Sequence, residues 1–307
     1  MYQKNMDDLT YTFRGCIPKG SGVCAADFVP NDNPIATNAI GEECGGKDVV
    51  PTSALLGIDP LNAYDLTDWD HNDDGSGDGV IIAADENQEW MLKWWWENYS
   101  KENAFPVTFF DLGMSKSARL WCGSKGDVIP FAFPDGWIKP REAITSDEIE
   151  EWEKKYQGDL WEGRTQWFCK PYVLLRSPYV RTVWMDLDCE VRSSIAELFD
   201  YCNEGDGFSI LKLSLENLDL FSAGVVVSKR LSPVTKKWAE NIYHENHKHF
   251  GDENVLIETL NKEKFKITPY PLIYNWPTII PQSCKTVIRH HIGGYGKTKI
   301  LGGLSVV

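Results

Sequence analysis

Blocks of apolar and polar residues alternate along the chain from residue 79 onward, each with the length of one strand or one helix. The apolar run 80–84 is rich in β-branched residues, which predicts a buried strand. A helical pattern over 86–99 follows it, and then a second apolar run at 105–110 and a second helical pattern at 115–121. Strands and helices that alternate at these lengths predict an α/β fold with a mostly parallel sheet flanked by helices.

The later part of the chain continues this pattern. Further strands are expected at 182–186, 207–211 and 223–228. Further helices are expected at 146–156, 166–176, 193–201, 233–249 and 253–260. The sequence therefore predicts one α/β domain over residues 79–307.

Residues 1–78 differ from this domain, because Gly, Pro, Asn and Asp are frequent and no helical or strand period persists. Positions 1–79 hold 14 acidic and 4 basic residues, so most of the net charge of −14 lies in the first quarter of the chain. We expect an irregular, acidic N-terminal extension. A chain this acidic is unsuited to general binding of nucleic acid, because such binding depends on neutralising backbone phosphates.

The composition of the 307 residues, 42% hydrophobic and 25% charged, is that of a folded globular protein. No apolar run approaches the roughly 18 residues that a membrane-spanning helix needs. The start of the chain does not resemble a secretory signal. The eight cysteines have no C-x-x-C spacing, which argues against a structural zinc site. We therefore expect a cytoplasmic protein in a reducing compartment, with no transmembrane segment.

Two carboxylates, Asp186 and Asp188, lie at the end of the predicted strand 182–186, two residues apart. In an extended chain such residues point to the same side, and open α/β sheets bind ligands just beyond the carboxyl ends of their strands. Two carboxylates this close repel each other unless a cation lies between them, and oxygen ligands suit Mg²⁺ or Mn²⁺. The alternative is that both carboxylates cap the helix expected at 193–201.

A glycine-rich segment near the end of the chain contains His291, Gly294 and Lys297. A neutral imidazole can complete the ligand set of a metal. Glycines allow the backbone to approach a phosphate closely, and a lysine adds a positive charge for it. The alternative is a surface turn with incidental basic residues.

Ala84, Asp85 and Asn87 close the first predicted strand. Polar side chains at such a strand end can bond to a ribose or a base. Asp85 is equally suited to cap the helix that follows. The residues at this strand end leave both roles open.

Together these segments resemble glycosyltransferase family 8, a family of retaining enzymes with the GT-A (Rossmann-like) fold. The resemblance covers residues 80–297, and it depends on the order and spacing of its parts more than on any single one. The parts are Ala84-Asp85-Glu86-Asn87, Lys170 on the helix before the metal strand, Asp186-Leu187-Asp188, Ser222-Ala223-Gly224, Asp252-Glu253, and an H-x-x-G-x-x-K motif made by His291, Gly294 and Lys297.

The resemblance implies a role for each of these parts. Asp186, Asp188 and His291 would hold Mn²⁺, or Mg²⁺, on the diphosphate of the donor. Asp252 and Glu253 would face the transferred sugar as catalytic residues. Contacts to the nucleotide sugar would come from Ala84, Asp85, Asn87, Lys170, Gly294 and Lys297.

Three positions depart from the family pattern. Ser222 stands where the family has Asn, Glu253 where it has Gln, and Lys299 where it has Trp. A carboxylate at Glu253 could stabilise a sugar cation or act as a nucleophile.

The resemblance implies an enzyme, a hexosyltransferase that moves a hexose from a nucleotide sugar to an acceptor hydroxyl with retention of configuration. The expected donor is a UDP-sugar, and the acceptor is a carbohydrate, a lipid-linked group or a protein. Two alternatives stay open. One is a phosphohydrolase of the haloacid dehalogenase class, which also uses a D-x-D after a strand, and the other is a catalytically inactive module that binds nucleotide sugars.

Three further patterns have structural explanations beside functional ones. Residues 70–78 match the first half of a calcium-binding loop but lack its bidentate Glu, and they also suit an acidic linker. Residues 94–96 are three tryptophans, of which we expect at least two in the core rather than stacked on sugars. The histidines at 244, 247 and 249 suit the C-terminal end of a helix better than a metal cluster.

Overall fold

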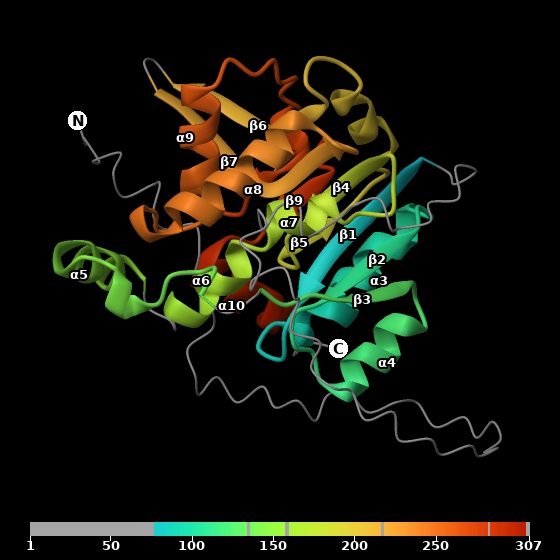
Figure 1. Ribbon diagram of the computed structural model, residues 1–307. Helices are drawn as coiled ribbons and strands as arrows, with labels where there is room; N and C mark the ends of the chain where they lie inside the picture. Colours follow the sequence, from blue (N-terminus) through green and yellow to red (C-terminus); the bar gives the residue numbers. More distant parts are fainter. Residues whose placement is uncertain (1–76, 134–135, 157–159, 216–217, 282, 305–307) are drawn as a thin grey trace, which may run out of the picture.

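The computed structural model describes residues 77–133, 136–156, 160–215, 218–281 and 283–304. Its centre is a six-stranded sheet with the strand order β3-β2-β1-β4-β7-β6 (Figure 1). Strands β3, β2, β1 and β4 are parallel to one another, whereas β7 is antiparallel to both β4 and β6. These strands are β1 (Asp78–Ala84), β2 (Val107–Asp111), β3 (Asp127–Pro130), β4 (Arg181–Met185), β6 (Phe208–Leu215) and β7 (Leu218–Lys229).

Helices cover both faces of this sheet, which confirms the predicted α/β class with a mostly parallel sheet. Alternate side chains of β1 point to opposite faces of the sheet. Val80 and Ile82 pack into one buried cluster, and Ile81 and Ala83 pack into the other. The first cluster includes side chains of α3 and α4, and the second includes side chains of α7, α8 and α9. The α-helices are α3 (Leu92–Glu102), α4 (Lys116–Gly123), α5 (Ser146–Lys155), α6 (Leu160–Trp167), α7 (Lys170–Leu175), α8 (Pro233–Glu245), α9 (Asp252–Lys262) and α10 (Gly293–Leu304). The 3-10 helices are η3 (Glu89–Met91), η4 (Arg141–Ala143), η5 (Ala196–Cys202), η6 (Asn246–Lys248) and η7 (Leu272–Tyr274).

A second, three-stranded sheet follows the end of β4. It has the order β5-β9-β8 and consists of β5 (Cys189–Val191), β9 (Ile288–His290) and β8 (Trp276–Pro277). Strand β9 is antiparallel to β5, with His290 opposite Cys189. This pairing brings the end of β9 next to the turn between β4 and β5, although the two segments are far apart in the sequence.

The predicted strands and most predicted helices are confirmed, with shifts at their ends. The helix predicted at 166–176 is two helices, α6 and α7. Pro171 lies in the first turn of α7, where backbone N–H groups have no partner within the helix, so a proline fits there but not in the middle of one long helix. The helix predicted at 193–201 is the 3-10 helix η5. The glycine-rich segment, for which a surface turn was the alternative to a binding role, is the start of α10, and Gly293 begins this helix with φ +70°. The short strands β3, β5, β8 and β9 were not predicted.

The predicted N-terminal extension lies outside the described residues up to position 76, and so does most of the calcium-type pattern at 70–78. Asp78, the last position of that pattern, begins β1, and its carboxylate pairs with Arg181 at 2.6 Å. Among the described residues, no helix combines the length and the apolar character that crossing a bilayer requires. The cysteines in this part of the chain are free thiols.

Candidate active site

A cavity lies at the carboxyl ends of β1 and β4, two neighbouring strands of the main sheet. Its empty volume is about 780 Å³, including space that is open to solvent. Open α/β sheets bind their ligands at this position. The predicted site residues that line the cavity are Lys170, Asp186, Asp188, Glu253 and Lys297.

Asp186 and Asp188 leave the end of β4, and each pairs with a different lysine. Nζ of Lys170 lies 3.0 Å from Asp186 Oδ1, and Nζ of Lys297 donates to Asp188 Oδ2 at 2.9 Å. The indole Nε1 of Trp184 also donates to Asp186 Oδ1, at 2.8 Å. These contacts fix both carboxylates at the wall of the cavity.

The carboxyl of Asp188 is buried, with 9% of its side chain exposed. Burial by itself would raise the pKa of Asp188, but the Lys297 ammonium and the His290 ring outweigh it and hold the pKa well below its ordinary value. Asp188 is therefore an anion in the folded protein at neutral pH, as a ligand for a cation has to be.

The ammonium group of Lys170 is buried between two carboxylates. Its Nζ lies 3.0 Å from Asp186 Oδ1 and 3.3 Å from Asp252 Oδ2, and it donates to the carbonyl of Ala223 at 3.1 Å. The ring of Trp184 has its centre 5.7 Å from the same Nζ. A buried charge needs such partners. Lys170 thus connects the end of β4 with the start of α9 and with β7.

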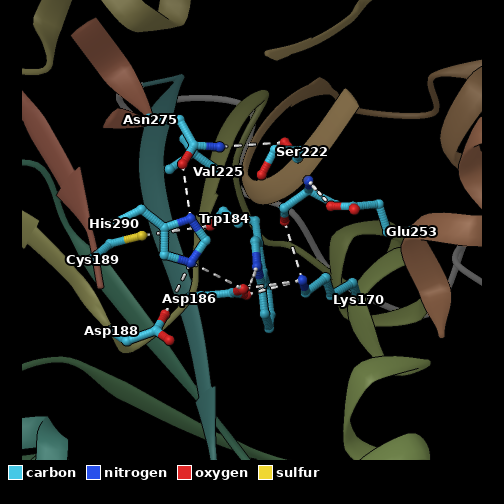
Figure 2. A network of polar contacts seen from close by, with 12 residues as sticks. Lys170, Trp184, Asp186, Asp188, Cys189, Ser222, Val225, Glu253, Asn275 and His290 are labelled. Atoms are coloured by element: carbon cyan, nitrogen blue, oxygen red, sulfur yellow. Dashed lines mark hydrogen bonds and ion pairs between the residues drawn. The ribbon is translucent and has the colours of Figure 1, made fainter. Parts of the chain in front are cut away.

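His290 faces the two aspartates, whereas the ring of the predicted His291 does not. His290 Nε2 lies 3.1 Å from Asp188 Oδ1 and 3.9 Å from Asp186 Oδ2 (Figure 2). His291 Nε2 lies 3.1 Å from Glu190 Oε2 instead. The backbone N–H of His291 does reach the D-x-D turn, where it donates to the carbonyl of Asp188 at 2.8 Å.

The side chains around His290 fit a divalent cation. Asp188, Cys189 and His290 each bring one potential ligand atom to within 4.8 Å of the others. Asp188 Oδ1 is buried and lies 3.1 Å from His290 Nε2, a separation that two ligands of one cation can have. Carboxylate oxygen and imidazole nitrogen are both accepted by divalent metals. Burial raises the pKa of Cys189 well above its ordinary value, which leaves its thiol neutral in the metal-free protein.

Asp85 and Asn87 lie just beyond β1 and bond to neighbouring helices. Asp85 Oδ1 accepts from the backbone N–H of Gln88 at 2.9 Å, which closes the turn before η3; the N-cap of η3 is Gln88, whose side chain makes no capping bond. The amide of Gln166 donates to the other oxygen of Asp85, and Asn87 Nδ2 donates to Glu162 Oε1 at 2.6 Å. Burial raises the pKa of Asp85. Gln88 and Gln166, which the sequence did not single out, line the cavity beside it.

Asp252 and Glu253 begin α9 and face different surroundings. Glu253 lines the cavity, and its Oε2 accepts from the backbone N–H of Ala223 at 2.8 Å. Asp252 has a fully buried side chain next to Lys170. Of the predicted catalytic pair, the structure thus brings Glu253 to the cavity surface and Asp252 to the buried side of Lys170.

The close backbone approach in the glycine-rich segment occurs at Gly296. A Cβ on this residue would lie 2.1 Å from the carbonyl carbon of His291, whereas a Cβ on Gly294 would meet nothing within 4 Å. Ala84, the remaining predicted residue, is buried in the core at the end of β1. From this segment, Ile292 and Lys297 line the cavity.

The sequence contained a pattern that indicates a buried His290, although the H-x-x-G-x-x-K motif pointed to His291 instead. Residues two apart in a strand share a face, and Ile288 is an apolar residue two positions before His290. Both side chains are buried in β9, while Arg289 between them is partly exposed. A short strand over these three residues would have predicted that His290 points inward.

The tryptophans 94–96 pack against the core, as expected. Trp95 is fully buried, and Trp94 and Trp96 are partly buried against the same cluster. The histidines near the end of α8 have separate partners: His244 packs against a neighbouring tyrosine, and His249 Nε2 lies 3.0 Å from a carboxylate of Glu258.

No family model matches the chain, and no curated protein matches it. Among solved structures it is similar to the glycosyltransferase GlyE of Streptococcus pneumoniae TIGR4, with 14% identity and a TM-score of 0.44 over 70% of this chain and 55% of GlyE. It is also similar to the galactosyltransferase LgtC in complex with donor and acceptor sugar analogues, with 14% identity and a TM-score of 0.43 over 75% of this chain and 97% of LgtC. A third similar structure is mouse xyloside xylosyltransferase 1, with 14% identity and a TM-score of 0.47 over 69% of this chain and 97% of that protein. All three proteins are glycosyltransferases, and the chain spans little more than half the length of GlyE. The likeness is distant, and neither a family nor an activity is assigned from it.

Proposed function

We propose that the protein is a glycosyltransferase that moves a hexose from a nucleotide sugar, a UDP-sugar, to an acceptor hydroxyl with retention of configuration. The observation that carries the proposal is the convergence of the D-x-D carboxylates, His290 and Lys297 in one cavity at the carboxyl end of the sheet. These groups combine a place for a cation with a positive side chain, which is what binding of a diphosphate requires. The order of motifs along the sequence supports the same activity.

The cation of this proposal is Mn²⁺ or Mg²⁺, held by Asp186, Asp188 and His290. When bound, it would supply positive charge that stabilises the diphosphate and the negative charge that develops on the leaving group. Lys297, on the cavity wall beside Asp188, is expected to bind a phosphate oxygen directly. The buried Lys170 balances the charge of Asp186 and holds its carboxylate in place.

The sugar is expected to lie against Glu253. The N–H of Ala223 holds one carboxylate oxygen of Glu253 at 2.8 Å, which fixes the orientation of the group. An oriented carboxylate can stabilise a positively charged sugar or attack its anomeric carbon. The nucleoside is expected near Asp85 and Asn87, together with Gln166, at the end of β1.

The phosphohydrolase alternative is not favoured. A phosphohydrolase of the haloacid dehalogenase class uses the first Asp of its D-x-D as a nucleophile. The second Asp of that class acts as an acid, whereas Asp188 pairs with Lys297 and is held as an anion. That class also gives no role to a lysine in the position of Lys297.

Incubation with a panel of UDP-sugars and Mn²⁺, with released UDP as the readout, tests the proposal. We expect the wild type to release UDP from at least one donor, and Asp188→Asn to be roughly 100-fold slower because it removes one charge from the cation site. The variant Asp147→Asn, on the exposed start of α5, serves as the control. Glu253→Gln keeps an oxygen for the Ala223 N–H, so we expect slower turnover with unchanged affinity for the donor.

Three other outcomes contradict the proposal. Phosphate release from p-nitrophenyl phosphate without UDP release favours the phosphohydrolase. Metal-dependent binding of UDP-sugars without any turnover favours the inactive binding module. Unchanged turnover in Glu253→Gln removes the catalytic role of that carboxylate.

A further inference from the structure

We propose that Asn275 is a positioning residue, which fixes the imidazole of His290 so that Nε2 is the nitrogen presented to a cation. The proposal depends on the cation site described above and adds a residue that does not itself touch the cation. Neither the sequence pattern nor the family resemblance singled out Asn275. It lies directly after η7 and before β8, and its side chain is completely buried.

The amide of Asn275 has one possible orientation. Its Nδ2 donates to the backbone carbonyl of Ser222 at 3.3 Å, and its Oδ1 lies 2.8 Å from Nδ1 of His290 (Figure 2). A carbonyl can only accept a hydrogen bond, so turning the amide around would set two oxygens against each other at Ser222. The nitrogen of the amide therefore faces Ser222, and the oxygen faces His290.

This orientation determines which nitrogen of His290 carries a hydrogen. The Asn275 oxygen is an acceptor, so Nδ1 of His290 has to be the donor. The other ring nitrogen, Nε2, is then the atom that can offer a lone pair, and it lies 3.1 Å from Asp188 Oδ1 and 3.9 Å from Asp186 Oδ2. A hydrogen bond from the far nitrogen of a metal-binding histidine commonly fixes its tautomer in this way.

The backbone holds Asn275 and His290 at a fixed separation. Strands β8 and β9 are paired, with Trp276 next to Arg289 and Pro277 next to His290. Asn275, directly before β8, and His290, the last residue of β9, therefore lie on two paired segments. Ser222 belongs to β7 of the main sheet, so the amide of Asn275 also links the small sheet to the main one.

Isotope-detected NMR of the histidine side chains tests the proposal on the full-length protein. Zn²⁺ serves as the probe, because it is diamagnetic and accepts the same ligands, and His290→Ala identifies the signals of His290. In the wild type with Zn²⁺ we expect Nδ1 of His290 to be protonated and Nε2 to be metal-bound. In Asn275→Ala we expect a mixture of tautomers and roughly 10–100-fold weaker Zn²⁺ binding at this site, the usual effect of losing such a partner.

Two variants separate positioning from a general effect on stability. Asn275→Asp keeps an acceptor for Nδ1, so we expect it to retain the wild-type tautomer. Asn246→Ala removes an equally buried amide that bonds to the carbonyl of Trp137, so we expect a loss of thermal stability with unchanged Zn²⁺ affinity.

The proposal is overturned if wild-type His290 binds Zn²⁺ through Nδ1, a result that needs no variant to fold. It is also overturned if Asn275→Ala keeps the wild-type tautomer and binds Zn²⁺ with an affinity within about twofold of the wild type. Loss of such a partner usually weakens metal binding by more than this. Absence of UDP-sugar turnover in a protein that shows the expected tautomer would instead count against the proposed function and leave the role of Asn275 standing.

Discussion

The imidazole of His290 lies directly against the backbone of Gly224. A methyl group on Gly224 would be 1.9 Å from Cε1 and 2.4 Å from Nδ1 of the ring, closer than any real contact allows. Gly224 belongs to β7, in the Ser222-Ala223-Gly224 segment, and its carbonyl accepts from the backbone N–H of Asp186 at 2.8 Å. A glycine at this position thus leaves room for the ring beside the D-x-D turn.

Gly224→Ala is therefore expected to displace His290 from the two aspartates. We predict that the free energy of Mn²⁺ binding, measured by calorimetric titration, falls by more than the free energy of unfolding. Gly302→Ala is the matched control, because a Cβ on this residue of α10 would meet nothing within 4 Å, and alanine favours the helix by about 1 kcal/mol. Mn²⁺ binding as tight in Gly224→Ala as in the wild type would contradict the role given to the ring.

Lys170 is expected to be essential for folding as well as for the site. Lys170→Met leaves the carboxylate of Asp252 buried beside Asp186 without the ammonium group, so we predict a loss of about 3–5 kcal/mol in the free energy of unfolding. Asp252→Asn in the same background should restore part of that loss. Urea unfolding followed by tryptophan fluorescence measures both effects.

Lys237, which pairs with Glu240 on the surface of α8, provides the control for Lys170. Lys237→Met should change the free energy of unfolding by less than about 1 kcal/mol, since exposed pairs contribute little. Equal effects of the two substitutions would show that the buried contacts of Lys170 do not stabilise the fold.

Arg164 on α6 is a second buried cation, and it bonds to backbone carbonyls in place of a carboxylate. Its guanidinium donates to the carbonyls of Asn246, His249 and Phe250 at 2.5, 2.9 and 3.3 Å. Burial lowers the pKa of Arg164 to about 10, so the group stays charged at neutral pH. Arg164→Met should cost roughly 3 kcal/mol in thermal or urea unfolding, because these buried carbonyls lose their donor.

Arg141 is the matched control for this substitution, because its contacts to Glu153 are exposed. Arg141→Gln should leave the unfolding midpoint almost unchanged. A midpoint for Arg164→Met that is as high as that of the Arg141 variant would contradict the stabilising role of the buried guanidinium.

His249 is expected to make stability depend on pH. Burial lowers the pKa of His249 despite the opposing carboxylates of Glu258 and Glu245, and the ammonium groups of Lys248 and Lys262 lower it further. The unfolded chain, with an ordinary histidine pKa of about 6.5, then takes up a proton before the folded protein does. Stability is therefore lost as the pH falls below about 6.5.

The variant His249→Gln should lose less stability than the wild type between pH 7.5 and pH 5.5, as measured by urea unfolding at both pH values. His244→Gln, which removes an exposed histidine of α8, controls for general effects of removing an imidazole. An equal pH dependence in the wild type and in His249→Gln would rule out this contribution.

Apart from the short, largely exposed β3, the main sheet was predictable because its strands contain apolar runs, such as Val80-Ile81-Ile82, with buried residues on both faces. The small sheet was not, because β5, β8 and β9 have only two or three residues each and no period is visible over such lengths. Since β9 carries His290, missing this strand also meant missing the orientation of the histidine.

The sequence predicted the part of the candidate site that lies at the end of a single strand, which is Asp186 and Asp188. Contacts between distant segments had no local signal: nothing near Asn275 in the sequence indicates that it bonds to His290 and Ser222. The same holds for the space that Gly224 leaves for the ring. Tertiary packing decides these positions, and sequence spacing does not encode them.

The most direct test of the central claim compares the two adjacent histidines. Calorimetric titration with UDP, with and without Mn²⁺, is carried out on the wild type, His290→Ala and His291→Ala. The account predicts Mn²⁺-dependent binding of UDP in the wild type, its loss in His290→Ala and its retention in His291→Ala. Retention in His290→Ala, or loss in His291→Ala only, would contradict a cation site formed by Asp186, Asp188 and His290.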